Sequence, residues 1–104
     1  MKRVDIAPRA SKDIRDSVAY YNAEQVGLGL RLADALESAY RLIQQSPSAG
    51  SIRYQHLLPV PTRMHVLKKF PFLVFYVEHN DHISIFRVLH ANRDLPTMLQ
   101  ENID

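Results

Sequence analysis

The clearest group of reactive side chains lies near the C-terminus of the sequence, where a polar cluster consists of Arg87, His90, Arg93 and Asp94. An apolar segment precedes the cluster, and the end of a strand there would deliver these side chains to the surface. Arginine pairs with carboxylates and phosphates, and histidine gains or loses a proton near neutral pH. The cluster is therefore predicted to contact another molecule. The simpler interpretation is a solvated strand end, in which Asp94 caps a short helix at residues 95–96 and pairs with Arg93.

Arg87 raises a separate problem, because strict alternation along a strand puts it on the same face as Ile83, Ile85 and Leu89. A charge on an apolar face needs a partner, since burying an unpaired guanidinium is very costly. We therefore expect either a β-bulge that redirects Arg87 or a face that is open to solvent or to another protein.

A second group of side chains lies upstream and could line a phosphate-binding surface; it consists of Arg53, Tyr54, His56, Arg63, His65, Lys68 and Lys69. An aromatic ring among cations is suited to stacking on an RNA base. On strands, however, such residues more often serve only to keep the surface soluble. An RNA site is thus the less favoured interpretation of this group.

No other motif in the sequence indicates chemistry. His79 and His82 flank a short polar connection, but no third ligand is evident, and we predict no metal site there. Glycine-rich phosphate loops, nucleophile elbows and paired-carboxylate motifs are absent. We therefore expect no cofactor.

The composition describes an ordinary folded domain. At 104 residues and 46% hydrophobic content, the chain is expected to form one domain over residues 1–104. It contains no cysteine, which excludes disulfides, thiolate metal sites and thiol catalysis. The N-terminal residues lack the apolar stretch of a signal peptide, and no apolar run is long enough to cross a membrane. We expect a cytoplasmic protein without membrane contact, and the net charge of +2 gives only weak support for nucleic-acid binding.

Hydrophobic periodicity indicates which elements must position these side chains. Apolar residues recur at three- and four-residue spacing over residues 8–24 and 29–46, which predicts two helices, and Pro47 stops the second. Strands are predicted at residues 2–7, 53–58, 63–70, 72–78 and 83–90, with a tight turn at Asn80 and Asp81. Residues 72–77 are apolar on both faces, as in a central strand.

This order of elements predicts an α+β fold. An N-terminal strand is followed by an antiparallel helical hairpin, which packs on one face of a mostly antiparallel sheet of three to five strands. The last predicted strand carries the polar cluster to the edge of the domain.

Three segments resemble the ParE/RelE toxin superfamily of type II toxin-antitoxin systems. The opening I-A-P-R-A-S-K-D-I-R-D-S-V-A-Y-Y is similar to the family's first strand and helix, K-K-F-P-F-L-V-F-Y-V to its central hairpin, and R-V-L-H-A-N-R-D-L to its last strand and tail. The tail is most similar to the ParE branch, whose members poison DNA gyrase and are neutralised by a cognate antitoxin. The resemblance thus implies a gyrase-directed toxin, with target contacts at Arg87, His90, Arg93 and Asp94.

The RelE branch provides an alternative, because its members cleave messenger RNA on the ribosome. In that case the resemblance would assign catalysis to Arg63, Arg87 and His90. The chain has no tyrosine after residue 76, so general acid chemistry would depend on His90 alone. A further alternative is a degenerate member that binds the antitoxin but is no longer toxic, and the antitoxin-binding residues stay unknown at this stage.

Overall fold

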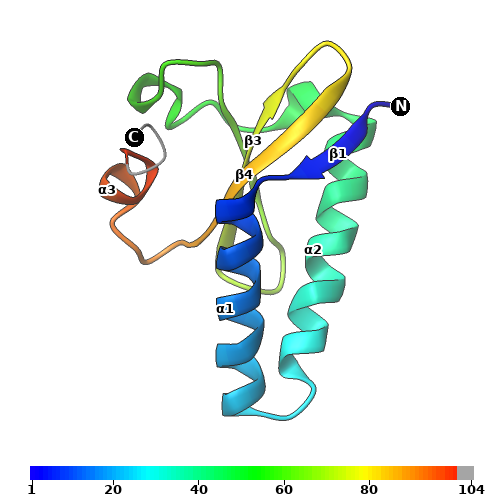
Figure 1. Ribbon diagram of the computed structural model, residues 1–104, viewed down its shortest axis with the longest axis vertical. Coiled ribbons are helices and arrows are strands. Elements are labelled where there is room, and N and C mark those ends of the chain that lie inside the picture. The colour runs from blue at the N-terminus through cyan, green and yellow to red at the C-terminus, as the bar shows by residue number, and fades with distance from the viewer. Residues whose placement is uncertain (101–104) are drawn as a thin grey trace.

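The N-terminal strand leads directly into a helical hairpin (Figure 1). The computed structural model of the chain describes residues 1–100. Strand β1 spans Arg3–Ile6, helix α1 spans Pro8–Glu24 and helix α2 spans Leu28–Gln45. Proline at the first position of α1 has the φ angle that a helix start requires. Both predicted helices are confirmed to within one residue at each end.

A close contact near the turn of the hairpin locks the two helices together. Asn22 Oδ1 of α1 accepts a hydrogen bond of 2.9 Å from the backbone N–H of Gly29 in the first turn of α2. A Cβ atom at residue 29 would lie 2.5 Å from the carbonyl oxygen of Val18. Only glycine therefore permits this separation of the helices.

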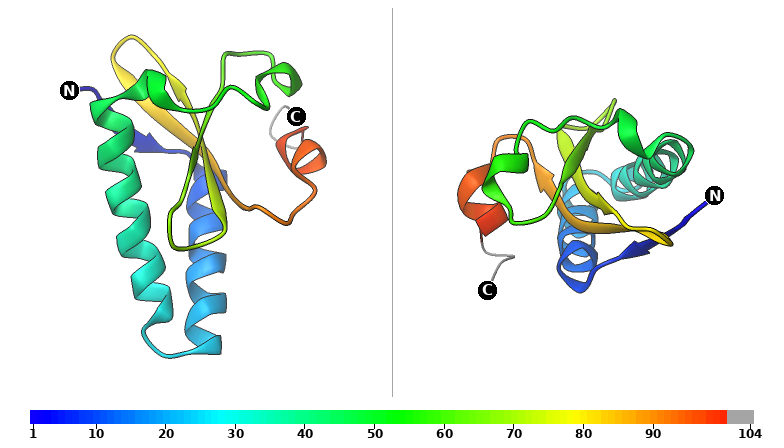
Figure 2. Two further views of the ribbon diagram at one scale, coloured as in Figure 1. Left: turned by 180° about the vertical axis from the view of Figure 1, so that it is seen from behind. Right: turned by 90° about the horizontal axis from the view of Figure 1, so that it is seen from above.

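The sheet contains four strands in the order β1-β4-β3-β2, and Figure 2 shows it from two further directions. β2 spans Arg63–Val66, β3 spans Phe72–Glu78 and β4 spans His82–His90. β1 runs parallel to β4, and the other pairs are antiparallel. The chain then forms a short helix α3, Leu95–Gln100. This is the predicted α+β architecture, with β3 and β4 in the centre.

Two predicted strands differ from the structure. Residues 53–58 were expected to be a strand but contain a 3-10 turn, Gln55–Leu57, and only Ser51 forms an isolated bridge to the sheet. The predicted strand at 63–70 ends at Val66, because the Leu67 N–H donates to the Phe72 carbonyl and closes a turn. Apolar residues in both segments pack on the cores from irregular backbone. Alternation in the sequence does not distinguish such a segment from a strand.

Each face of the sheet has its own hydrophobic core. The face covered by the helical hairpin includes Leu32, Leu36, Ile43, Val74 and Ile85. The opposite face is covered by α3 and the segment before β2, and its core consists of Met64, Leu73, Phe75, Leu89, Leu95 and Leu99. Burial on both faces explains the continuous apolar sequence of β3. Within residues 1–100, no helix has the length and hydrophobicity to span a bilayer.

The Tyr40 hydroxyl on α2 offers a test of this packing. Tyr40 is only 8% exposed, and its hydroxyl has no hydrogen-bond partner within the part of the chain that the structure describes. Burial, aided by the nearby Glu37 carboxylate, raises the pKa of Tyr40 to about 12 from 10.0. The unfolded chain would therefore ionise first, and the stability that depends on Tyr40 should fall as the pH rises from 10 towards 12.

We predict that Tyr40→Phe stabilises the fold by about 1 kcal/mol at neutral pH, because it removes an unsatisfied buried hydroxyl. It should also reduce the loss of stability above pH 10. Urea unfolding of both proteins at several pH values measures the difference. Tyr20→Phe is the matched control, since Tyr20 is 62% exposed and should change little. A destabilised Tyr40→Phe variant would contradict the packing described.

Candidate functional site

A β-bulge in β4 redirects Arg87. Phe75 of β3 pairs with Arg87, whereas the adjacent Tyr76 pairs with Ile85, so Phe86 is the extra residue. The bulge reverses the alternation, and Arg87 no longer shares the face of Ile85 that packs against the helices. Of the two arrangements expected for Arg87, the structure contains the redirecting bulge.

Arg87 is buried in a complete hydrogen-bond network with Asp13 of α1. Its Nε and Nη2 donate to the two Asp13 carboxylate oxygens at 2.8 and 3.1 Å, and Nη1 donates to the Met98 carbonyl of α3 at 2.9 Å. The side chains of Arg87 and Asp13 are 2% and 15% exposed. A buried ion pair is tolerable only when its remaining polar atoms are also bonded, and this one fulfils that condition.

Asp13 also closes the open edge of the sheet. β1 pairs with β4 only as far as Ile85, so the C-terminal half of β4 has no neighbouring strand on that side. Asp13 Oδ2 accepts a hydrogen bond of 3.0 Å from the Val88 N–H. A helix side chain thus satisfies a backbone donor that would otherwise lack a partner at the sheet edge.

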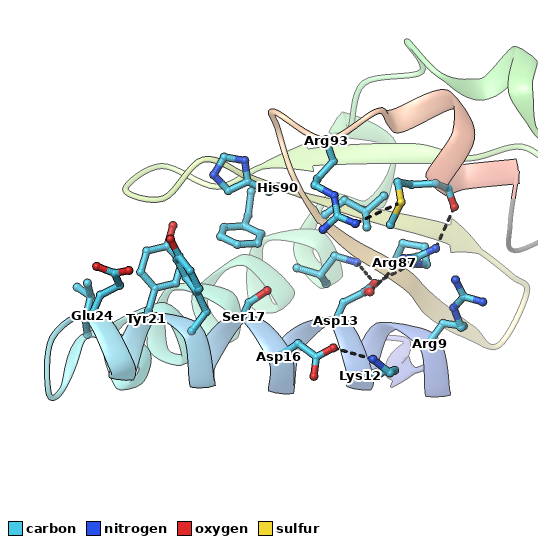
Figure 3. Close-up of a pocket in the computed structure, with 16 residues that line it drawn as sticks. Arg9, Lys12, Asp13, Asp16, Ser17, Tyr21, Glu24, Arg87, His90 and Arg93 are labelled. Carbon is cyan, nitrogen blue, oxygen red and sulfur yellow. Dashed lines mark hydrogen bonds and ion pairs between the residues drawn. The ribbon is translucent and has the colours of Figure 1, made fainter.

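A groove runs between α1 and this edge of β4, and we call it the α1 groove (Figure 3). Its volume is about 910 Å³. Asp13 and Arg87 lie in it, with Lys12 and Asp16 joined by an ion pair of 2.8 Å. The hydrogen bond from Lys12 holds the pKa of Asp16 below its usual value. Its other side chains come from α1, the start of β3, the end of β4 and the tail (residues 91–100), and include Arg9, Ser17, Tyr20, Tyr21, Glu24, Phe72, His90, Arg93 and Met98.

His90 at the end of β4 and Arg93 on the tail that follows it lie over the α1 groove (Figure 3). The His90 ring packs edge-on against Phe72, and its Nδ1 accepts the Asn92 N–H at 3.0 Å. Arg93 is exposed, and its Nη2 lies 3.5 Å from the Met98 sulfur. Asp94 caps α3 through hydrogen bonds from Thr97, as the simpler interpretation expected, but it does not pair with Arg93 within the described residues.

The predicted site residues therefore divide into two kinds. His90, Arg93 and Asp94 lie close together at the end of β4 and the start of the tail, and they are at least partly exposed. Their contact with a target stays a prediction. Arg87 has its donors engaged inside the domain and serves in this structure to hold α1, β4 and α3 together.

Of the three residues considered for ribonuclease chemistry, Arg87 and His90 both line the α1 groove, whereas Arg63 lies apart from them. Arg63 is opposite Tyr76 on β2, whereas His90 is opposite Phe72 on β4. These positions are about 13 Å apart along the strands and about 10 Å apart across them. Arg63 donates to the Gly50 carbonyl at 2.9 Å, and Arg87 is buried in its own network.

The remaining basic residues are also distributed over separate places. Arg53, Tyr54 and His56 lie on the segment before β2. His65, Lys68 and Lys69 line a second groove of about 690 Å³ beside α2, which we call the α2 groove. Burial and the neighbouring Lys68 lower the pKa of His65.

His79 and His82 stack at the β3–β4 turn, with ring centroids 4.4 Å apart. His82 also bonds to the Asp81 carboxylate at 2.7 Å. Among residues 1–100, no group of three or more histidine or carboxylate side chains could hold a metal ion.

Asp13 holds Arg87 in place, and the sequence alone did not single it out. It lies on α1 three residues after the fully buried Ala10 and beside Ile14, and therefore borders the inward stripe of the helix. Asp13 at the border of an apolar helix stripe and Arg87 on an apolar strand carry opposite charges. This pair of unusual positions could have indicated a buried ion pair between them.

Comparison with known proteins identifies related sequences and folds. A family model described as the ParE toxin of the type II toxin-antitoxin system, parDE, matches residues 4–95. Among solved structures, the chain is similar to one described as a chromosomal ParDE TA system from P. aeruginosa, with 19% identity and a TM-score of 0.73. The likeness covers 88% of this chain and 98% of that chain, and at this identity it supports the fold alone. No curated protein matches the sequence.

The network around Asp13 leads to a prediction about stability. Asp13→Ala would leave Arg87 buried without its carboxylate and the Val88 N–H without its acceptor. We expect a loss of about 3–5 kcal/mol in the free energy of unfolding, measured by urea denaturation. Asp16→Ala is the matched control one turn away on α1. It breaks only an exposed pair and should have little effect. Equal losses in the two variants would contradict a structural role for Asp13.

Proposed function

The chain belongs to the ParE toxins of type II toxin-antitoxin systems, and on that premise we propose that it poisons DNA gyrase by binding the enzyme through the α1 groove and the tail. Family membership implies a cognate antitoxin as partner, which would neutralise the toxin. We place this activity in the cytoplasm, where gyrase acts on DNA.

The observation that carries the proposal is the difference in burial between Arg87, which lies inside the domain, and His90 and Arg93, which lie nearer its surface. Arg87, which a ribonuclease mechanism would require at the surface, is 2% exposed, and each of its guanidinium nitrogens is hydrogen-bonded within the domain. His90 at the end of β4 and Arg93 on the tail also border the α1 groove and lie nearer the surface. Such an arrangement favours recognition of a protein surface over proton transfer.

Each tail residue has a proposed role. Arg93, which is exposed, would pair with carboxylates on the target, because a guanidinium forms two parallel hydrogen bonds to a carboxylate. His90 would contact the target through the ring nitrogen that does not bond to Asn92. Asp94 would position the tail by capping α3, and Arg87 would position it through the Met98 carbonyl.

Point substitutions test the proposal better than removal of the tail. Truncation after His90 would delete Leu95 and Leu99, which are buried in the second core, and the fold itself would suffer. We predict that His90→Ala combined with Arg93→Glu raises the concentration for half-inhibition of gyrase supercoiling by about tenfold or more. Arg15→Glu is the control, because Arg15 is an exposed cation that lines neither groove.

The same proteins distinguish the alternatives. The wild-type chain should inhibit supercoiling or trap cleaved DNA and leave ribosome-bound messenger RNA intact. Codon-phased cuts in messenger RNA, with gyrase unaffected, would overturn the gyrase assignment in favour of a ribonuclease. Neither activity, in a chain that still binds its antitoxin, would identify a degenerate toxin.

A further inference from the structure

Two open edges of the sheet are closed by groups from the domain itself. Beside the C-terminal half of β4, Asp13 accepts the Val88 N–H. At the outer edge of β2, Ser51 exchanges two hydrogen bonds of 2.9 Å with Met64. The outer edge of β1 differs, because no strand or bridge pairs with it among residues 1–100. An unpaired edge is a template for another strand.

The backbone groups of β1 alternate between the two sides of the strand. The Ala7 N–H donates to the Ile85 carbonyl, so the odd-numbered residues of β1 face β4 and the even-numbered residues face away. The Lys2 carbonyl agrees with this direction, because it accepts a hydrogen bond of 3.0 Å from a side chain of α2. The N–H and C=O groups of Val4 and Ile6 therefore point outward. Within the described residues they have no hydrogen-bond partner.

This edge is accessible from outside the domain. Arg3 and Asp5 are exposed, and Ile6 is 39% exposed. Val4 packs on the core under the helical hairpin, whereas Arg3 and Asp5 lie on the opposite face of the sheet and form an ion pair of 3.1 Å. β1 lies at the border of the sheet (Figure 2). A strand of another molecule therefore has access to it.

The sequence of β1 is complementary to itself in an antiparallel pair. When Val4 lies opposite Val4 of a second copy, its outward N–H and C=O form both hydrogen bonds of that pair. In the same register, Arg3 of each copy lies opposite Asp5 of the other. These positions form a pair without backbone hydrogen bonds, where facing side chains are closest, and opposite charges there favour association.

We propose that the outer edge of β1 is the interface of a homodimer, in which two copies pair antiparallel around Val4 and join their sheets into one. The contact is isologous and closes as a two-fold dimer. Its axis passes beside Val4, perpendicular to the sheet, so both helical hairpins lie on the same face. Residues 1–6 do not line the α1 groove, which stays outside the interface. The proposal is therefore independent of the target.

Charged side chains on an edge strand usually prevent association. In β1 the two charges have opposite signs and lie on the same face, so they oppose only some pairings. A parallel pair in register would place Arg3 opposite Arg3, whereas the antiparallel pair around Val4 neutralises both charges. A strand of a different protein would have to supply this complement, and a second copy of the chain already contains it.

The test begins with the mass of the isolated full-length toxin, measured by analytical ultracentrifugation over a range of concentrations. Because the paired strands are short, we expect a reversible dimer with a Kd on the order of 10–100 µM. A chain that stays monomeric up to about 1 mM would overturn the proposal.

Charge variants test the register. Arg3→Asp makes both charged positions acidic and Asp5→Arg makes both basic, so each variant alone faces like charges and should dimerise about tenfold or more weakly. A mixture of the two should form a heterodimer, and the double variant with both changes in one chain should recover the wild-type affinity. Arg15→Asp, at an exposed residue of α1 far from β1 in sequence, is the control. Equal affinities in all variants would place the contact elsewhere and overturn the proposal.

The fold should not be affected by these changes, since the ion pair between Arg3 and Asp5 is exposed and contributes little to stability. Circular dichroism and thermal melts of each variant check that a loss of dimer comes from folded protein.

Gyrase and the antitoxin provide the remaining outcomes. Arg3→Asp should inhibit supercoiling as the wild type does, because its α1 groove and tail are unchanged. A wild-type dimer that does not inhibit gyrase would refute the gyrase assignment and support the interface. If the wild type is monomeric and Arg3→Asp weakens binding of the antitoxin encoded beside the toxin gene, the edge belongs to a strand of the antitoxin and the proposal is overturned.

Discussion

The ion pair between Asp13 and Arg87 is the contact on which the arrangement of the domain depends. It joins α1 to the central strand β4, and through the Met98 carbonyl it also joins both to α3. A charged pair removed from water stabilises a fold only when each donor and acceptor finds a partner. Here the bulge at Phe86 turns the guanidinium to where the carboxylate and the carbonyl can both reach it. Leaving either charge buried without its partner would cost free energy, and the pair therefore fixes the relative positions of α1, β4 and α3.

The short first strand makes this contact possible. β1 ends at Ile6, and α1 begins at Pro8, so the helix crosses the sheet edge just where β4 loses its parallel neighbour. Asp13 then lies opposite Val88 and replaces the missing strand at one backbone donor. The same geometry leaves space between α1 and β4, and the α1 groove is that space. The proposed target surface is thus a result of how the edge of the sheet is closed.

Periodicity in the sequence was sufficient to predict the helices, which pack on one core, and the central strands, whose apolar residues are buried on both faces of the sheet. It failed at residues 53–58, where Tyr54, Leu57 and Leu58 pack on the second core from an irregular segment. A bulge was one of two arrangements expected for Arg87. Alternation placed this charge on an apolar face but did not show whether a bulge or an open face would resolve the conflict. Asp13 was missed because its partner is distant in sequence, and a single sequence gives no register between a helix and a strand.

The parallel pairing of β1 with β4 also has a consequence for the order of synthesis. Residues 3–6 leave the ribosome first, but their partners are residues 82–85, near the end of the chain. Contacts between such distant segments form slowly because a long loop must close before they contribute. The nascent polypeptide therefore cannot complete its sheet, or form the pair between Asp13 and Arg87, until β4 has been synthesised. However early α1 leaves the ribosome, the groove between α1 and β4 can form only after that point.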